Sequence, residues 1–207
     1  LRNCNGGESD LAIGSPERPV GRFWGVGEVG LDLYWSRDFE AEQRECFVRQ
    51  VELSIEYDLP LVIHTRDAWD DMLVILIADH GMPYPSTLTT GAEERQRIPM
   101  IWTGGALEQS GTEVTTYCSQ ADLAATLLAQ LGIAHEDFIF SHDIFDPNQP
   151  HYAFWTWNNA FGLKDNEGKI IYNLTGEKTI QSEGDAPAYE QTGKAIVQTI
   201  HQDIRKR

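Results

Sequence analysis

The sequence is short of basic residues and of long apolar runs. Its 207 residues include 16 Lys and Arg against 32 Asp and Glu, which gives a formal net charge of −16. A chain this acidic repels polyanions, which argues against a nucleic-acid-binding module built on a basic face. A nuclease is still compatible with it, because a divalent metal ion can invert the local field. No apolar run approaches the roughly 18 residues that a bilayer-spanning helix needs, so we expect no membrane segment in this chain.

Cysteine is also scarce, and two nucleophile motifs are missing. The three cysteines, Cys4, Cys46 and Cys118, are odd in number and far apart. This spacing argues against a disulfide framework or a zinc knuckle and favours free thiols. The chain has no phosphate-binding glycine loop and no Gly-x-Ser-x-Gly sequence. The catalytic residues therefore stay unknown at this level. Apolar residues at 41% and charged residues at 23% are typical of a globular domain.

In the first half of the chain, apolar periodicity predicts helices and strands in alternation. The stretch 39–57 has helical spacing, and Leu59–Ile63 has the pattern of a buried strand that stops at His64. Leu73–Ala78 fits a helix or a strand, and its β-branched residues favour the strand. Residues 81–97 are rich in Pro, Ser, Thr and Gly, which predicts a surface loop. Ile98–Trp102 is a further short strand candidate.

The second half predicts one well-capped helix, followed by strands and a final helix. Ser119 can cap a helix over 120–131, with Asp122 as its capping-box partner and Gly132 as its left-handed stop. The later part is rich in aromatic and β-branched residues. It predicts strands over 152–157, 169–174 and 178–182 and a helix from about Pro187 to the end.

Candidate metal ligands follow three of the apolar stretches. They are Glu28, His64 and the adjacent pair Asp79 and His80. In α/β proteins, ligands gather at the carboxyl ends of parallel strands. Carboxylate and imidazole groups together suit Zn²⁺, Mn²⁺ or Mg²⁺. Structural roles remain open as well, because Glu28 could serve as a helix cap or salt-bridge partner and His64 could be a hydrogen-bonded structural histidine.

Residues 22–71 resemble the TatD-type metal-dependent deoxyribonucleases. The segment Gly27–Trp35 reads Gly-Glu-Val-Gly-Leu-Asp-Leu-Tyr-Trp, and Leu59–Ala68 reads Leu-Pro-Leu-Val-Ile-His-Thr-Arg-Asp-Ala, with a helix carrying Gln43 and Phe47 between them. The resemblance implies a TIM-barrel hydrolase with a divalent metal, a DNA substrate and a cytoplasmic location. It also implies that Glu28 and His64 are metal ligands. The opening His-x-His of that family, its later histidine and its final aspartate have no counterpart here.

Residues 72–207 resemble a different family, the alkaline phosphatase/sulfatase superfamily. The segment Leu73–Gly81 is similar to the metal-binding strand of that superfamily. The segments Ile98–Trp102, Cys118–Thr126 and Asn158–Gly162 point to its lipoteichoic-acid-synthase-like phosphoglycerol transferase branch. The resemblance implies that Asp79 and His80 are metal ligands and that the substrate is a phosphate or sulfate ester. It also implies a periplasmic or extracellular-facing location. The catalytic Thr, Ser or Cys of a full-length member lies upstream of the matching part.

The two resemblances join awkwardly near Trp69–Met72. If Leu59–Ile63 and Leu73–Ala78 were parallel neighbours in one sheet, only residues 64–72 would connect them. A parallel crossover needs about a dozen residues or more. We therefore expect that His64 and the Asp79-His80 pair do not share one sheet edge. The sequence favours a composite of two unrelated ancestors, such as a recombined or misassembled reading frame.

The sequence thus predicts an α/β protein in three parts. Residues 1–21 are an unassigned loop, 22–71 form a TIM-barrel-like βαβ fragment, and 72–207 form a sulfatase-like α/β fragment that ends in antiparallel strands and a C-terminal helix. The main functional prediction is an incomplete metal-dependent hydrolase or transferase that acts on phosphate or sulfate esters and uses Mn, Zn, Mg or Ca. The alternatives are a TatD-like deoxyribonuclease, for which alone DNA is the substrate, and a catalytically inert composite. Because both catalytic sets are incomplete, the sequence does not decide whether the chain is an enzyme. Strand edges left open by missing strands would promote self-association.

Overall fold

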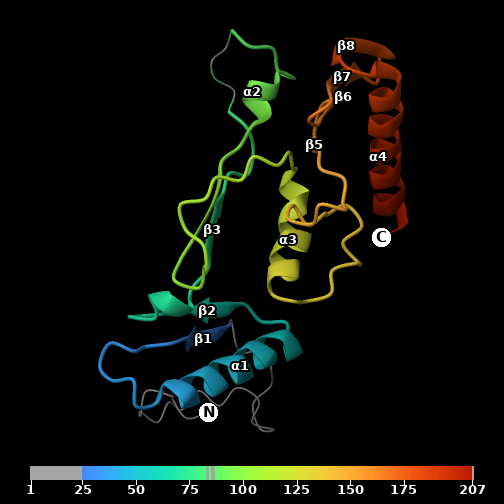
Figure 1. The fold of residues 1–207 in the computed structure, drawn as a ribbon. Helices are drawn as coiled ribbons and strands as arrows, with labels where there is room; N and C mark the ends of the chain where they lie inside the picture. The colour runs from blue at the N-terminus through green and yellow to red at the C-terminus, as the bar shows by residue number, and fades with distance from the viewer. Residues whose placement is uncertain (1–24, 83, 85–86, 207) are drawn as a thin grey trace. The chain divides into compact units, whose positions relative to one another are not determined.

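The computed structural model describes residues 25–82, 84 and 87–206. The chain divides into two compact units (Figure 1), Leu1–Leu76 with Ile101–Ser110 and Ile77–Met100 with Gly111–Arg207. The predicted loop over 1–21 lies outside the described residues. The predicted fold class is confirmed, because the chain starts with a βαβ arrangement and continues to an antiparallel sheet and a C-terminal helix.

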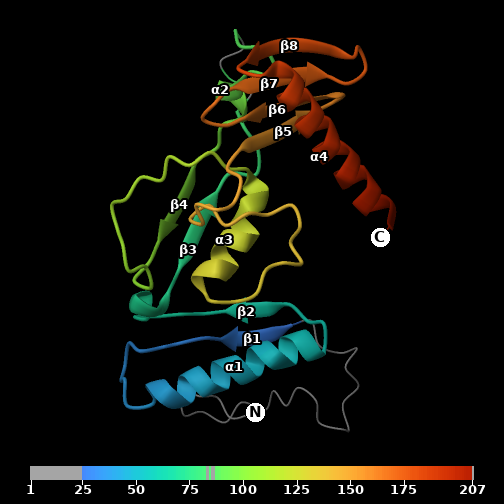
Figure 2. The ribbon, with the colours of Figure 1, turned by 45° about the vertical axis from the view of Figure 1, so that its right-hand side comes forward.

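The first unit is built around a βαβ arrangement. Strand β1 (Val26–Val29) and strand β2 (Leu61–Ile63) pair in parallel, and helix α1 (Glu40–Glu56) connects them. The helix lies alongside the strand pair in Figure 2, and α1 contacts β1. The helix predicted over 39–57 is therefore confirmed. The buried apolar residues of this unit are Val26, Val29, Leu31, Leu33, Leu53 and Ala68.

Strand β1 carries an irregularity at the position of Glu28. Val26 pairs with Leu61 and Val29 pairs with Ile63, so three steps along β1 match two along β2. One extra residue is therefore accommodated in β1, which defines a β-bulge. The bulge leaves Val26 and Val29 buried, whereas both Gly27 and Glu28 between them are exposed. A bulge of this kind re-aims a side chain that regular alternation would have placed elsewhere.

Strands β3 (Val74–Ile77) and β4 (Met100–Thr103) form a separate two-stranded sheet. The strand alternative for Leu73–Ala78 is thus confirmed, and so is the strand at Ile98–Trp102. Because β2 pairs with β1 and β3 pairs with β4, β2 and β3 do not share a sheet. This agrees with the expectation from the short connection, which contains only a 3-10 turn, η2 (Trp69–Asp71). The predicted loop after Gly81 includes one short helix, α2 (Glu93–Gln96).

The well-capped helix of the second unit forms as predicted. It begins with a 3-10 turn, η3 (Gln120–Asp122), and continues as α3 (Leu123–Gln130). Ser119 and Asp122 form a capping box, in which the Ser119 N–H donates to Asp122 Oδ2 at 2.6 Å. Gly132 ends the helix with φ of 66°, a left-handed conformation that glycine adopts without strain.

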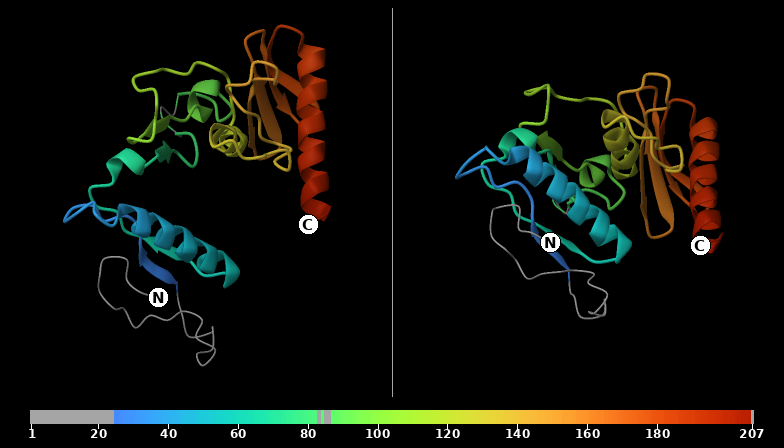
Figure 3. Two further views of the ribbon diagram at one scale, coloured as in Figure 1. Left: turned by 60° about the horizontal axis from the view of Figure 1, so that its bottom comes forward. Right: turned by 90° about the horizontal axis from the view of Figure 1, so that it is seen from below.

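An antiparallel four-stranded sheet dominates the rest of the second unit. Its strands follow chain order, namely β5 (Ala153–Trp157), β6 (Ala160–Lys164), β7 (Lys169–Asn173) and β8 (Lys178–Glu183). Helix α4 (Ala186–Lys206) runs along this sheet in both views of Figure 3. The core between them contains Phe161, Leu163, Ile170 and Tyr172, with Tyr189, Ile196 and Val197 packed against it.

Strand β6 is the element that the sequence did not predict as a strand. It contains Gly162, and a β-carbon there would lie 2.1 Å from Cε2 of the Trp155 ring. The glycine therefore admits the tryptophan ring of the neighbouring strand. Glycine is depleted in strands in general, which is why the propensity pattern failed here.

The structure also tests the expectation that the cysteines are free thiols. The free thiol expected at Cys118 is confirmed, whereas the one expected at Cys46 is wrong, because Cys46 is disulfide-bonded. Cys4 lies outside the described residues. None of the helices in the described part of the chain combines the length and the hydropathy that a bilayer span requires.

Candidate metal centre

Glu28 lies on β1, and His64 directly follows the adjacent strand β2. The His64 N–H donates to the Val29 carbonyl at 2.7 Å, directly after the paired positions Val29 and Ile63. A β-carbon on Gly30 would lie 2.1 Å from the His64 carbonyl oxygen, and Gly30 has φ of 146°. Only glycine therefore permits the close approach of the residue 30 backbone to the His64 carbonyl.

The strand pair continues past β1 and β2 and has one buried and one polar face. Val29, Leu31 and Leu33 are buried. Since side chains alternate along an extended strand, the residues between them belong to the opposite face. Asp32 on one strand pairs with Arg66 on the other in a parallel bridge. We call the set Glu28, Asp32, His64 and Arg66 the polar face. Glu28 and His64 are both exposed on it.

Asp32 and Arg66 form an ion pair on the polar face. Arg66 Nε donates to Asp32 Oδ1 at 3.0 Å, and Nη2 donates to Oδ2 at 2.6 Å. The hydrogen bonds from Arg66, together with the Tyr34 N–H and the charge of nearby His64, lower the pKa of Asp32 in spite of its partial burial. The buried Gln43 of α1 fixes the Asp32 backbone, accepting from its N–H at 2.8 Å and donating to its carbonyl at 3.0 Å.

The polar face offers two donors of the kind that divalent cations prefer. Glu28 is exposed and has no ion-pair partner among residues 25–82, 84 and 87–206, and His64 directly follows the neighbouring strand. A carboxylate and an imidazole fit Zn²⁺ or Mn²⁺. Within the described residues, however, no group of three or more His, Cys, Asp or Glu side chains is arranged to hold a metal ion. The pair alone does not make up a catalytic zinc site, because catalytic zinc takes three protein ligands.

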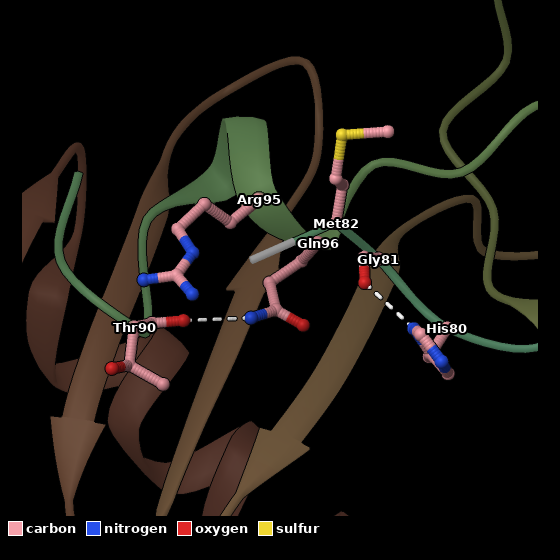
Figure 4. A pocket seen from close by; sticks show the side chains of 6 residues that line it. All are labelled: His80, Gly81, Met82, Thr90, Arg95 and Gln96. Atoms are coloured by element: carbon pink, nitrogen blue, oxygen red, sulfur yellow. Dashed lines mark hydrogen bonds between the residues drawn. The ribbon is translucent and has the colours of Figure 1, made fainter. Parts of the chain in front are cut away.

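Asp79 and His80, the other predicted ligands, follow β3 and belong to the second unit. Asp79 Oδ1 lies 3.8 Å from His80 Nε2, and both side chains are highly exposed. The hydrogen bond of His80 Nδ1 to the Gly81 carbonyl and the charge of Asp79 raise the pKa of His80. Figure 4 shows His80 at a pocket that is also lined by Gly81, Met82, Thr90, Arg95 and Gln96. The two predicted ligand pairs thus belong to different units of the chain.

Asp32, Gln43 and Arg66 belong to the segments that resemble the TatD-type family, but the sequence alone predicts no role for them. Their contacts give them one, because they hold the polar face in register. A second polar cluster was not identified from the sequence. Buried Asp122 accepts from the His142 N–H at 2.9 Å and lies 3.2 Å from His142 Nδ1. The capping-box pattern pointed to Asp122 as a helix cap only, since nothing in the sequence spacing links it to His142.

Comparison with known proteins shows that the first part of the chain is similar to metal-dependent hydrolases. Residues 20–98 match the model of the family described as TatD related DNase. The match includes β1, α1 and β2 with both Glu28 and His64. It extends past residue 71, where the sequence resemblance described above ends.

Particular relatives of this segment come from several bacteria. The chain is 43% identical over 51 residues to the metal-dependent hydrolase YabD of Bacillus subtilis, which is 25% of this chain and 20% of that protein. It is 39% identical over 71 residues to the metal-dependent hydrolase YcfH of Escherichia coli K12, covering 34% of this chain and 27% of that protein. It is also 39% identical over 82 residues to the metal-dependent hydrolase TatD of Mycobacterium tuberculosis, covering 36% and 31%. The chain therefore spans a third or less of the length of these relatives.

A solved structure is similar to the larger part of the chain. It is described as a protein in the alkaline phosphatase superfamily from Vibrio parahaemolyticus, with a TM-score of 0.44 and 16% sequence identity. The likeness covers 72% of this chain and 36% of that one. The family that residues 22–71 resemble is thus the one whose model matches the first part of the chain.

Proposed function

We propose that the first unit carries part of the divalent-metal centre of a TatD-type hydrolase, in which Glu28 and His64 bind the ion. The observation that carries this proposal is that Glu28 lies on β1 and His64 directly follows its parallel partner β2, within a segment that matches the TatD related DNase family. The relatives of this segment are named metal-dependent hydrolases. The reaction we propose is metal-dependent hydrolysis of a phosphodiester bond in DNA, with water as the nucleophile.

Each residue of the polar face has a distinct part in this proposal. A bound divalent ion would supply Lewis-acid stabilisation of the negative charge that develops on the phosphate. The Glu28 carboxylate and the His64 imidazole would each bind the ion. Arg66 neutralises Asp32, so Glu28 is the carboxylate of this face that has no cationic partner among the residues the structure describes. Gln43 keeps Asp32, and with it the register of the face, in place.

Metal binding tests the proposal directly. We expect the full chain to bind about one Mn²⁺ weakly, because a two-donor site lacks the third protein ligand of a catalytic centre. The Glu28→Gln and His64→Gln variants should each lose this binding in a calorimetric or electron paramagnetic resonance titration. Glu42→Gln is the matched control, since Glu42 is an exposed carboxylate on α1. Unchanged binding in Glu28→Gln would contradict the proposal.

Cleavage of DNA is the second measurement. Any Mn²⁺-dependent release of nucleotides from single-stranded DNA should disappear in Glu28→Gln and persist in Glu42→Gln. Because the chain spans only part of its relatives, we expect this activity to be low. Cleavage that persists equally in both variants would assign it to something other than the polar face.

A second candidate is supported by the geometry around β3. The Asp79 carboxylate and the His80 imidazole lie side by side, 3.8 Å apart, and His80 shares a pocket with the cationic Arg95. A metal at this pair beside a cationic side chain would suit a phosphate or sulfate ester, as in the alkaline phosphatase/sulfatase superfamily. In this case, Mn²⁺ binding would vanish in the Asp79→Ala/His80→Ala double variant and survive in Glu28→Gln. Absence of binding in the unaltered chain would contradict both candidates and favour the inert composite.

A further inference from the structure

Two aromatic side chains stand in solvent where the polar face ends. Tyr34 is 54% exposed and Trp35 is 80% exposed. Their rings meet edge to face, with centroids 4.8 Å apart. The guanidinium carbon of Arg66 lies 4.7 Å from the centroid of the Tyr34 ring and 5.9 Å from that of Trp35. Tyr34, Trp35 and Arg66 together form what we call the aromatic ledge.

The ledge is fixed to the polar face through shared contacts. Arg66 is held by both oxygens of Asp32, and the Tyr34 N–H donates to Asp32 Oδ1 at 3.3 Å. Asp32 in turn is anchored by Gln43. Along the strands, Arg66 is two residues from His64 and Asp32 is four residues from Glu28. A hydrogen-bonded surface carrying exposed aromatic rings therefore continues along the strands from the candidate metal ligands.

Packing does not account for the exposed position of Trp35. A tryptophan that leaves most of its surface in water contributes little apolar burial to the fold. Exposed aromatic rings in contact with an arginine are the features on which nucleic acid bases stack. Stacking uses the base and not the phosphate, which suits a chain whose formal charge of −16 repels the DNA backbone.

We propose that the aromatic ledge is a stacking platform for a base of single-stranded DNA, with the Trp35 ring as the main contact. This inference rests on the proposed function, because it assigns a substrate contact to the same surface. It goes beyond that function by naming a binding element that contains no metal ligand. The ledge would hold an unpaired base while the adjoining phosphodiester lies toward Glu28 and His64.

Binding of oligothymidylate in EDTA tests the ledge without any contribution from metal or cleavage. The full chain is titrated against a fluorescein-labelled eight-residue oligothymidylate at low salt, and its anisotropy is recorded. A stacked base is worth about 1–3 kcal/mol when its aromatic partner is changed to alanine, which corresponds to about 5- to 150-fold in the dissociation constant. We expect Trp35→Ala to weaken binding by that factor and Trp35→Phe to restore most of it.

Two controls separate base stacking from other contacts. Trp69→Ala removes a tryptophan of the first unit that is 54% exposed and lies outside the ledge, and it should leave binding unchanged. An abasic oligomer of equal length keeps the phosphates, so it should bind the unaltered chain weakly and Trp35→Ala equally weakly. Equal binding of the two oligomers, equal effects of both tryptophan variants, or no binding at all would overturn the proposal.

The same titration distinguishes this proposal from the metal-centre proposal. In EDTA, Trp35→Ala should weaken oligothymidylate binding by the same factor in the Glu28→Gln background as in the unaltered chain, since the ledge needs no metal. If Trp35→Ala binds oligothymidylate normally while Glu28→Gln loses Mn²⁺ binding, the stacking role of the ledge is wrong and the metal-centre proposal stands. If Mn²⁺ binding is insensitive to Glu28→Gln while Trp35→Ala still loses the oligomer, the ledge stands as a binding site on its own.

Discussion

Arg66 binds both carboxylate oxygens of Asp32 across the two parallel strands of the first unit, at 3.0 and 2.6 Å. The two residues are far apart in sequence and also pair through their backbones. Paired hydrogen bonds of this kind are short, directional and charge-assisted. The pair therefore joins the end of the first strand to the end of the second and orients the polar face on which Glu28 and His64 stand.

Replacing Asp32 by asparagine should weaken the first unit in a pH-dependent way. The pKa of Asp32 is lowered in the fold, so its ionised form contributes stability that is present above its ordinary pKa of about 3.9 and is lost as the pH falls through the lowered value. At pH 7 we expect Asp32→Asn to raise the unfolding constant by less than about tenfold, since partly exposed ion pairs contribute little.

Urea unfolding at pH 7 and at pH 3 measures this effect. The difference between Asp32→Asn and the unaltered chain should shrink as the pH falls between those values. Asp58→Asn is the control, since Asp58 is an exposed carboxylate of the same unit. A difference that grows toward acid pH would mean that the carboxylate does not stabilise the fold through its charge.

Gly30→Ala should be among the most damaging substitutions in the first unit. The added methyl group would lie 2.1 Å from the His64 carbonyl oxygen, at a residue with φ of 146°. The clash and the backbone strain together should cost about 2–4 kcal/mol. Hydrogen exchange of peptides that cover 26–33 and 60–66 would report the local loss of protection.

Gly132→Ala is the matched control for that substitution. Gly132 also has positive φ, 66°, but nothing lies within 4 Å of the added methyl group. It should therefore cost only about 1–2 kcal/mol, the strain of a left-handed residue. Equal costs at the two glycines would show that the strands do not approach as closely as described.

Asp122→Asn should destabilise the second unit by about 2–3 kcal/mol. The buried carboxylate accepts from the Ser119 N–H on one oxygen and from the His142 N–H on the other. Asparagine supplies one acceptor only, so one buried N–H would be left without a partner. Urea unfolding compares this variant with Asp137→Asn, which changes an exposed carboxylate in a nearby turn. An equally small effect of both variants would exclude a stabilising network at Asp122.

Gly193→Ala provides a test of the contact between α4 and the sheet, because the sign of its effect is informative. In an exposed helix this change stabilises by about 0.5–1 kcal/mol. Here the added methyl group would lie 2.0 Å from Cε2 of the buried Phe161 ring, so we expect a loss of about 1–3 kcal/mol from overpacking. Thr192→Ala, on the exposed side of the same helix, should change the free energy of unfolding little.

The local sequence pattern was sufficient to predict most of the helices and strands. Helical spacing located α1 to within one residue at each end, and the capping residues of α3 formed the predicted box. Strand β6 was missed because Gly162 accommodates the Trp155 ring, a contact between strands that propensity does not contain. The Cys46 disulfide was missed because cysteine count and spacing say nothing about which chain segments meet.

The candidate site could be predicted in part. Strand ends and the family resemblance identified Glu28 and His64, which the structure places on β1 and directly after the adjacent strand β2. The sequence could not show the bulge that exposes Glu28, since a bulge depends on the register between two strands and not on either strand alone. It also could not show that Arg66 reaches Asp32 and Tyr34 at once, because the turn after Leu33 sets that geometry.

The two units are interleaved along the chain, with backbone passing between them after residues 76, 100 and 110. A truncation at Trp69–Met72, where the two resemblances meet, would therefore not cut the molecule into its natural pieces. It would strip Ile101–Ser110 from the first unit and leave that segment attached to the complete second unit. Deletion mapping of activity should instead use an internal excision of 77–100 joined by a short linker, with the chain ended at Ser110.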